Sequence, residues 1–80
     1  QPEDFELLSE ISGIEPISRN RSIREIEYLN RRFGKGRWRK LKGTATIQYK
    51  HSGRVVRAEL HWYEAHGIGA VKWKVKRELE

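Results

Sequence analysis

The sequence has no cysteine, no long apolar run and few aliphatic residues. Without cysteine the chain can form neither a disulfide framework nor a thiolate metal site. No segment is long and apolar enough to span a membrane, and no signal-peptide core is visible, so we expect no membrane partner. The chain begins with Gln rather than Met, which suggests a piece or a processed domain of a longer protein.

The 80 residues are enough for one small domain, 1–80, with a modest core. Three Trp, three Tyr and two Phe compensate for the scarcity of aliphatic residues, because aromatic side chains add large buried areas. The sequence therefore predicts a single domain in which aromatic residues supply much of the core.

Acidic residues are scarce after the first part of the chain. Residues 1–15 contain five acids and no base, whereas seventeen bases and six acids follow from Arg19 onward. The formal net charge is +6 and the isoelectric point is near 10.0. A basic domain with interleaved aromatic residues predicts a nucleic-acid partner, RNA in particular. On charge alone, a membrane surface or an acidic protein would also be possible partners, although we expect no membrane partner.

The stretch 43–75 alternates between apolar and polar residues. Its middle part has apolar residues at even positions and polar or amphipathic residues at odd positions: Val56, Ala58, Leu60 and Trp62 against Arg57, Glu59, His61 and Tyr63. A period of two is typical of a half-buried β-strand. The same alternation recurs on both sides, so we predict a three-stranded antiparallel meander within a sheet that spans 38–79.

The two hairpin turns are predicted at 52–53 and 67–68, where glycine supplies the positive φ that tight turns need. Both choices place apolar residues opposite each other, and a slip by one residue would break this match. The predicted pairs are Tyr49–Val56, Ile47–Ala58, Ala45–Leu60, Leu60–Val75 and Trp62–Trp73.

Two helices are predicted before the sheet. The first is predicted at 3–12, and together with the connector that follows it makes up an acidic N-terminal segment, 1–16. The main helix is predicted at 22–33, where Ser22 and Glu25 match the capping-box pattern and apolar residues recur at helical spacing. We expect it to pack on the face of the sheet that contains the tryptophans. The predicted fold class is α+β, with one or two N-terminal helices packed on one face of a three- to four-stranded antiparallel sheet.

The opposite face of the predicted sheet is polar and mostly basic. Glu59, His61 and Tyr63 form a row on the central strand, beside the lysines of the last strand. This face is either a solvated surface or an anion-binding surface with acid–base groups at its centre. On the second interpretation, its RNA-binding candidates are Arg57, Lys72, Lys74 and Lys76.

The segment 34–42 joins the predicted helix to the sheet, and five of its nine residues are basic. We expect it to lie along a phosphate backbone, with Arg37, Arg39 and Lys42 as further RNA-binding residues. Trp38 is a candidate for stacking on a base. The alternative for Trp38 is a core residue that caps the sheet edge.

The polar row also suggests a chemistry, namely metal-free cleavage of RNA by attack of the 2′-hydroxyl on the adjacent phosphate. This reaction needs a base, an acid and nearby cations. His61 is the candidate base, with Glu59 holding or replacing it, and Tyr63 or His66 is the candidate acid. His61 and Glu64 point to opposite faces of a strand, so we predict no metal site and no cofactor.

A helix followed by a basic antiparallel meander, joined by the string WRKLKG, resembles the RelE-type ribonuclease toxins. More broadly, it is similar to the barnase, EndoU and colicin nuclease group. The string LHWYEAHGIG, ending in KWKVKREL, resembles C-terminal domains of bacterial polymorphic toxins. The resemblance covers residues 22–80, and by position Arg57, Tyr63 and Lys74 match parts that such toxins use.

This resemblance implies an endoribonuclease toxin domain that acts in the bacterial cytoplasm, on free RNA or on the ribosome. Delivery as part of a larger secreted toxin is one route to that compartment. An acidic immunity protein or antitoxin would be the expected protein partner. The alternative function is a non-catalytic RNA- or DNA-binding domain that uses the same basic face of the sheet.

Overall fold

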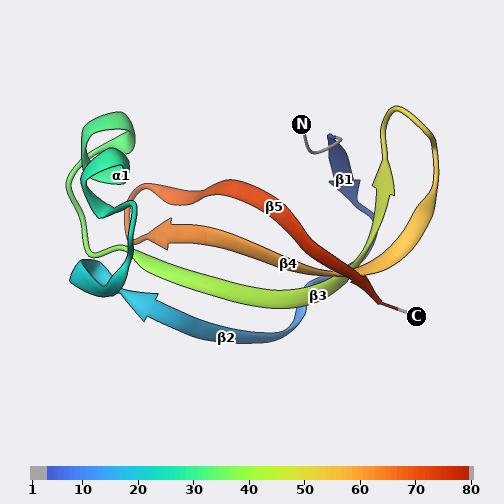
Figure 1. The fold of residues 1–80 in the computed structure, drawn as a ribbon, viewed down its shortest axis with the longest axis horizontal. Helices are drawn as coiled ribbons and strands as arrows, with labels where there is room; N and C mark the ends of the chain where they lie inside the picture. The colour runs from blue at the N-terminus through green and yellow to red at the C-terminus, as the bar shows by residue number, and fades with distance from the viewer. Residues whose placement is uncertain (1–3, 80) are drawn as a thin grey trace.

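A computed structural model describes residues 4–79 of the chain, and most of them lie in one antiparallel sheet (Figure 1). Its strands are β1 (Phe5–Leu7), β2 (Ser12–Arg19), β3 (Arg39–Tyr49), β4 (Val55–Ala65) and β5 (Gly69–Leu79). The helical elements in this range are the 3₁₀ turn η1 (Asn20–Ser22) and the helix α1 (Ile26–Phe33). The strand order is β1-β3-β4-β5, and β2 pairs with β3 on the same edge as β1.

The predicted fold of one or two helices packed on one face of a sheet is therefore wrong. In place of the helix predicted at 3–12, β1 and the residues leading to β2 lie along the edge of β3, while Glu3 falls outside the described residues. Backbone bonds fix this segment, including Leu8 N to Thr46 O at 2.8 Å. The long edge of β3 satisfies the backbone of this segment, which overrides its weak helical spacing.

The predicted meander of β3, β4 and β5 is confirmed, and each of these strands is eleven residues long. The register of its first hairpin was predicted two residues away from its true position, because Ile47 faces Val56 and Ala45 faces Ala58. A shift of two residues preserves the face of every side chain. The predicted division into an apolar and a polar face therefore holds along the middle of β4, even though the predicted pairs of this hairpin do not. Near the end of β4, Tyr63 and Ala65 on the side predicted to be polar are buried.

The second hairpin matches the predicted register at its centre, where Leu60 faces Val75. The indole rings of Trp62 and Trp73 stack with their centroids 4.5 Å apart. Nearer the turn, a bulge in β5 shifts the pairing by one residue, and Lys72 there adopts a positive φ of 60°. The bulge increases the local twist of this edge strand.

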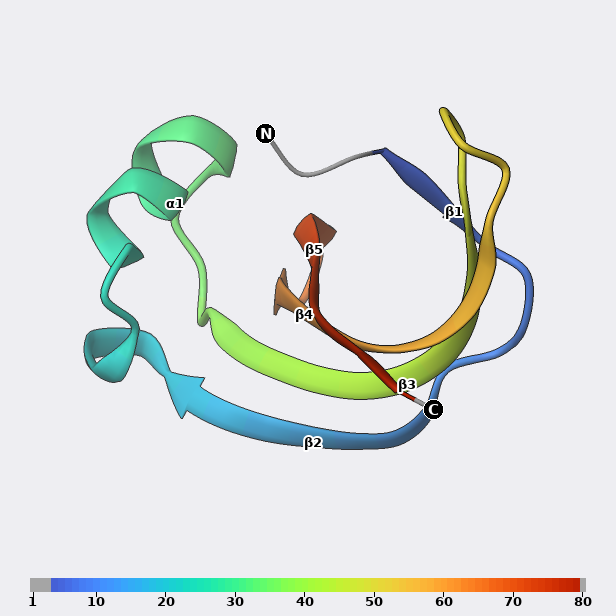
Figure 2. The same ribbon diagram turned by 45° about the vertical axis from the view of Figure 1, so that its right-hand side comes forward.

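The sheet buries its apolar face by curling (Figure 2). β3 and β4 bend through a wide arc and form a half-barrel around their own side chains. The buried residues of this cluster are Leu41, Ala45, Ile47, Tyr49, Ala58, Leu60 and Trp62. At Gly43, a Cβ atom would collide with Ile11, so this glycine allows the chain before β2 to approach the sheet closely.

The helix α1 packs at one end of the sheet rather than on the tryptophan face, which the curled sheet already covers. It begins at Ile26, and Ser22 ends η1 without forming the predicted cap. The helix is held by Trp38, whose indole Nε1 donates to Asn30 Oδ1 at 3.1 Å and to the carbonyl of Gly34 at 3.2 Å. The second buried cluster lies here and contains Ile23, Leu29, Trp38, Tyr63 and Ala65.

Neither helix in the described part of the chain has the length and apolar character needed to cross a membrane.

Candidate nucleic-acid interface

A hydrogen-bonded pair, His61 and Glu59, lies at the centre of β4 on the polar face of the sheet. His61 Nε2 lies 2.8 Å from Glu59 Oε2, and a carboxylate can only accept, so this nitrogen donates. Arg77 on β5 donates to the other oxygen, Oε1, from Nε at 3.0 Å and Nη2 at 2.9 Å. The hydrogen bond from His61 and the charge of Arg77 lower the pKa of Glu59 below 4.5. Glu59 is therefore a charged anchor that holds the imidazole in place.

Beside His61 the surface is hollowed, and lysines surround the hollow. Its volume is about 160 Å³, well below the roughly 300–1,000 Å³ of sites for drug-sized ligands, so it suits a small anionic group. Lys40 comes from β3, and Lys72 and Lys74 come from β5. We call this site the basic hollow, and its lining residues are Glu25, Lys40, His61, Trp62, Tyr63, Lys72 and Lys74.

Tyr63 connects the hollow to the segment that leads into α1. Its hydroxyl donates to Glu25 Oε1 at 2.8 Å, and the residue is only 8% exposed. Burial, together with the carboxylate of Glu25, raises the pKa of Tyr63 to about 12. A phenol this weakly acidic is a poor proton donor near neutral pH, so the geometry favours a structural role for Tyr63 over the predicted role of acid.

The other candidate acid, His66, is exposed in the turn between β4 and β5 and does not line the basic hollow. The structure therefore brings together His61, Glu59, Lys72 and Lys74 from the predicted site. It leaves His66 outside this group.

Several predicted RNA-binding residues already have protein partners on the polar face. Arg57 donates to Thr46 Oγ1 at 3.1 Å. Lys42 faces His61 across the sheet and approaches Glu15 at 3.8 Å. Because an exposed hydrogen bond or surface ion pair of this kind contributes little stability, both cations stay open to a competing phosphate.

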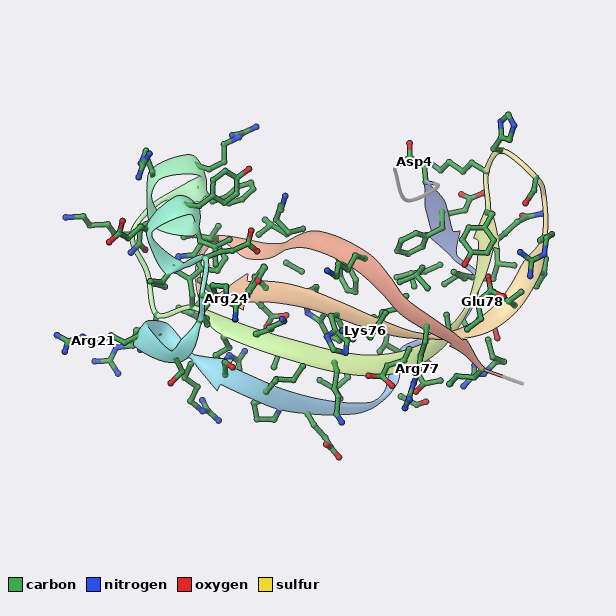
Figure 3. All side chains as sticks on the ribbon, viewed as in Figure 1. Asp4, Arg21, Arg24, Lys76, Arg77 and Glu78 are labelled. Atoms are coloured by element: carbon green, nitrogen blue, oxygen red, sulfur yellow. The ribbon has the colours of Figure 1, made fainter. Side chains whose placement is uncertain are left out.

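The remaining predicted RNA-binding residues lie in different settings. Arg39 forms an ion pair with Glu64 at 2.9 Å, and Arg37 is exposed before β3. Lys76 is exposed on β5, beside Arg77 (Figure 3). Trp38 is completely buried, so the core interpretation is correct and it cannot stack on a base.

Two charged residues of the basic hollow, Lys40 and Glu25, were missed at the sequence level, and Trp62 was predicted only as a core residue. Lys40 lies two residues before Lys42 on β3, and alternate residues of a strand share a face. This spacing was sufficient to place Lys40 on the polar face. Glu25 was assigned to a capping box, whereas its carboxylate accepts the hydrogen bond from Tyr63. The contact between the helix segment and the strand joins residues 38 positions apart, so no local pattern could indicate it.

Within residues 4–79, no three His, Asp or Glu side chains are grouped so that they could hold a metal ion. Comparisons of the chain with models of protein families, with curated proteins and with solved structures find no match. We therefore infer the function from the geometry and the charge of the polar face.

Proposed function

We propose that this domain binds RNA through the polar face of its sheet, with a backbone phosphate in the basic hollow. The observation that supports this proposal most directly is the convergence of Lys40, Lys72 and Lys74 around a hollow of phosphate-compatible size. The net charge of +6 supports it as well, because phosphate contacts by Lys and Arg supply most of the affinity for nucleic acids.

A protein partner explains the same charge less well. The lysines surround a concave site, and an acidic protein surface would more readily contact exposed cations on a flat or convex face. Arg24, between η1 and α1, adds a further exposed cation at the helical end of the molecule (Figure 3). An RNA strand that passes through the hollow would find a further phosphate partner there.

The binding proposal is tested by fluorescence anisotropy with a labelled RNA oligonucleotide at low salt. Lys40→Ala, Lys72→Ala and Lys74→Ala should each weaken binding, whereas Lys50→Ala, at the tip of the β3–β4 hairpin, should have little effect. Each variant removes one positive charge, so the comparison separates a defined site from general attraction. Equal losses in all four variants would contradict a phosphate site in the hollow.

A second candidate function, metal-independent cleavage of RNA, is favoured by the pair of His61 and Glu59 beside the lysines. A histidine held by a carboxylate is a suitable general base, and the lysines would stabilise charge on the phosphate in the transition state. On this proposal, His61 removes the proton of the 2′-hydroxyl and the 2′-oxygen attacks the adjacent phosphate, while the bond between phosphorus and the 5′-oxygen breaks. One product then ends in a 2′,3′-cyclic phosphate, and the leaving 5′-oxygen takes a proton from water to become the 5′-hydroxyl of the other product. Acting as a toxin, such an enzyme would work in the bacterial cytoplasm.

The cleavage proposal is tested with purified protein and RNA, free or on ribosomes. His61→Ala should lower the cleavage rate by about 10²-fold or more, while RNA affinity changes little. EDTA should leave the rate unchanged. Expression of the wild type, but not of His61→Ala, should arrest bacterial growth. If the protein binds RNA but does not cleave it, the cleavage proposal is wrong and only the binding proposal stands.

A further inference from the structure

An exposed aromatic ring, Tyr28 of α1, lies at the rim of the basic hollow. Lys72, which lines the hollow, places its Nζ 5.2 Å from the centroid of this ring. Glu25, which lines the same hollow, directly precedes α1 and lies three residues before Tyr28, about one helical turn away. Tyr28 therefore borders the site where the phosphate is proposed to bind.

The ring of Tyr28 is both held and accessible. The residue is 43% exposed, and its ring meets that of Phe33 edge-on, with centroids 6.3 Å apart. Phe33 is half-buried in the cluster around Trp38 and provides a firm support for the ring. Tyr28 contributes nothing to the buried clusters, so packing does not account for a large aromatic residue at this place.

An aromatic ring next to a cluster of cations is the combination that binds unpaired nucleotides. Bases stack on such a ring while lysines contact the backbone, and any base can stack because each has a π-face. In a duplex, the faces of the bases are already stacked on their neighbours. We propose that this site selects single-stranded RNA, with one base on Tyr28 and the adjoining phosphate in the basic hollow; this inference rests on the proposed function.

Lys72 connects the two parts of this site. In the free protein its ammonium group lies over the ring of Tyr28, where a cation–π contact is worth little at an exposed position. Its flexible stem allows the ammonium to turn towards a phosphate in the hollow when RNA binds. The ring face is then released for a base.

The test is fluorescence anisotropy with one RNA sequence, presented as a single strand and as a duplex with its complement. Wild-type protein should bind the single strand more tightly. Tyr28→Ala should weaken single-strand binding about 5- to 150-fold and leave duplex binding nearly unchanged. Tyr28→Phe should restore single-strand binding, because the stacking surface is kept. His51→Ala, which removes an exposed ring at the distant hairpin tip, is the matched control.

The outcomes separate this inference from the function on which it rests. If Tyr28→Ala binds single strands as the wild type does, or loses single-strand and duplex affinity equally, the stacking role is wrong while RNA binding stands. Wild-type affinity for the duplex equal to that for the single strand would also overturn it. If the wild type binds neither RNA, both proposals fail.

Discussion

Among single residues, Glu59 has the greatest influence on the centre of the polar face. It accepts hydrogen bonds from His61 and Arg77, and its side chain is only 16% exposed. Its carboxylate sets the orientation of the imidazole and determines which imidazole nitrogen carries the proton. A substitution that removes its charge but keeps its shape separates these effects from packing.

We predict that Glu59→Gln alters the pH dependence of stability. Because the folded pKa of Glu59 is lowered below 4.5, its stabilising effect is complete above that pH and is lost as the pH falls through the folded pKa. The free energy of unfolding, measured with urea between about pH 6 and pH 3, should therefore fall less steeply in Glu59→Gln than in the wild type. Glu27→Gln, at an exposed position of α1, is the control and should follow the wild type. If the free energy of unfolding falls equally steeply with pH in Glu59→Gln and in the wild type, the charge of Glu59 does not stabilise the fold.

At the scale of elements, the bulge in β5 shapes the basic hollow. Lys72 adopts a φ of 60° there, a conformation that L-residues other than glycine adopt at a cost of about 1–2 kcal/mol. The neighbouring Lys74 pairs with His61 and has no positive φ. The two lysines line the same hollow but differ in backbone conformation, which makes them a matched pair.

We predict that glycine at these two positions changes stability in opposite directions. Lys72→Gly relieves the positive φ and should raise the free energy of unfolding by up to about 1 kcal/mol. Lys74→Gly places a residue that loses more backbone freedom on folding at a strand position without a positive φ, and it should lower the free energy of unfolding by about 0.5–1 kcal/mol. Both should weaken RNA binding, since each removes one charge from the hollow. Chemical denaturation and RNA titration measure the two effects, and destabilisation by both variants would show that Lys72 is not strained.

The elements differ in how far their sequences determine them. The alternation on β4 correctly indicated which side chains share a face, because this depends only on parity. The pairing of the first hairpin depends on the turn, and the turn is centred one residue earlier than the glycine suggested, with Tyr49 N bonded to Arg54 O. The bulge at Lys72 has no glycine or asparagine to mark it, so no local pattern predicts it.

At the scale of the whole molecule, the curl of the sheet explains why the predicted fold was wrong. A flat sheet with an apolar face needs a layer of helices to cover it, and this expectation led to the helix on the tryptophan face. The half-barrel instead encloses its own apolar side chains, and α1 is left at one end beside Trp38 and Tyr63. Curvature arises from twist and bulges across several strands, so no single segment indicates it.

The same architecture explains which part of the site was predictable. His61, Glu59 and Lys74 belong to adjacent strands of the meander, and their proximity followed from alternation and a short turn. Glu25 and Tyr28 reach the hollow only because the helix packs at this end of the sheet. That position is a tertiary outcome, which the local sequence around them does not contain.

The dependence of RNA affinity on salt concentration shows whether a defined group of lysines, rather than net charge, holds RNA phosphates on the polar face. We compare the wild type with the triple variant Lys40→Ala, Lys72→Ala, Lys74→Ala. The control is a triple variant of equal charge away from the hollow: Arg19→Ala, Arg21→Ala, Lys50→Ala.

For a single strand, the slope of log K against log salt concentration is roughly −0.7 for each phosphate contacted. We expect the slope of the triple variant of the hollow to be smaller in magnitude than that of the wild type by about 2, which corresponds to three lost phosphate contacts. The control variant should lose much less. Equal reductions in both triple variants, or a wild-type affinity that does not depend on salt, would contradict the account.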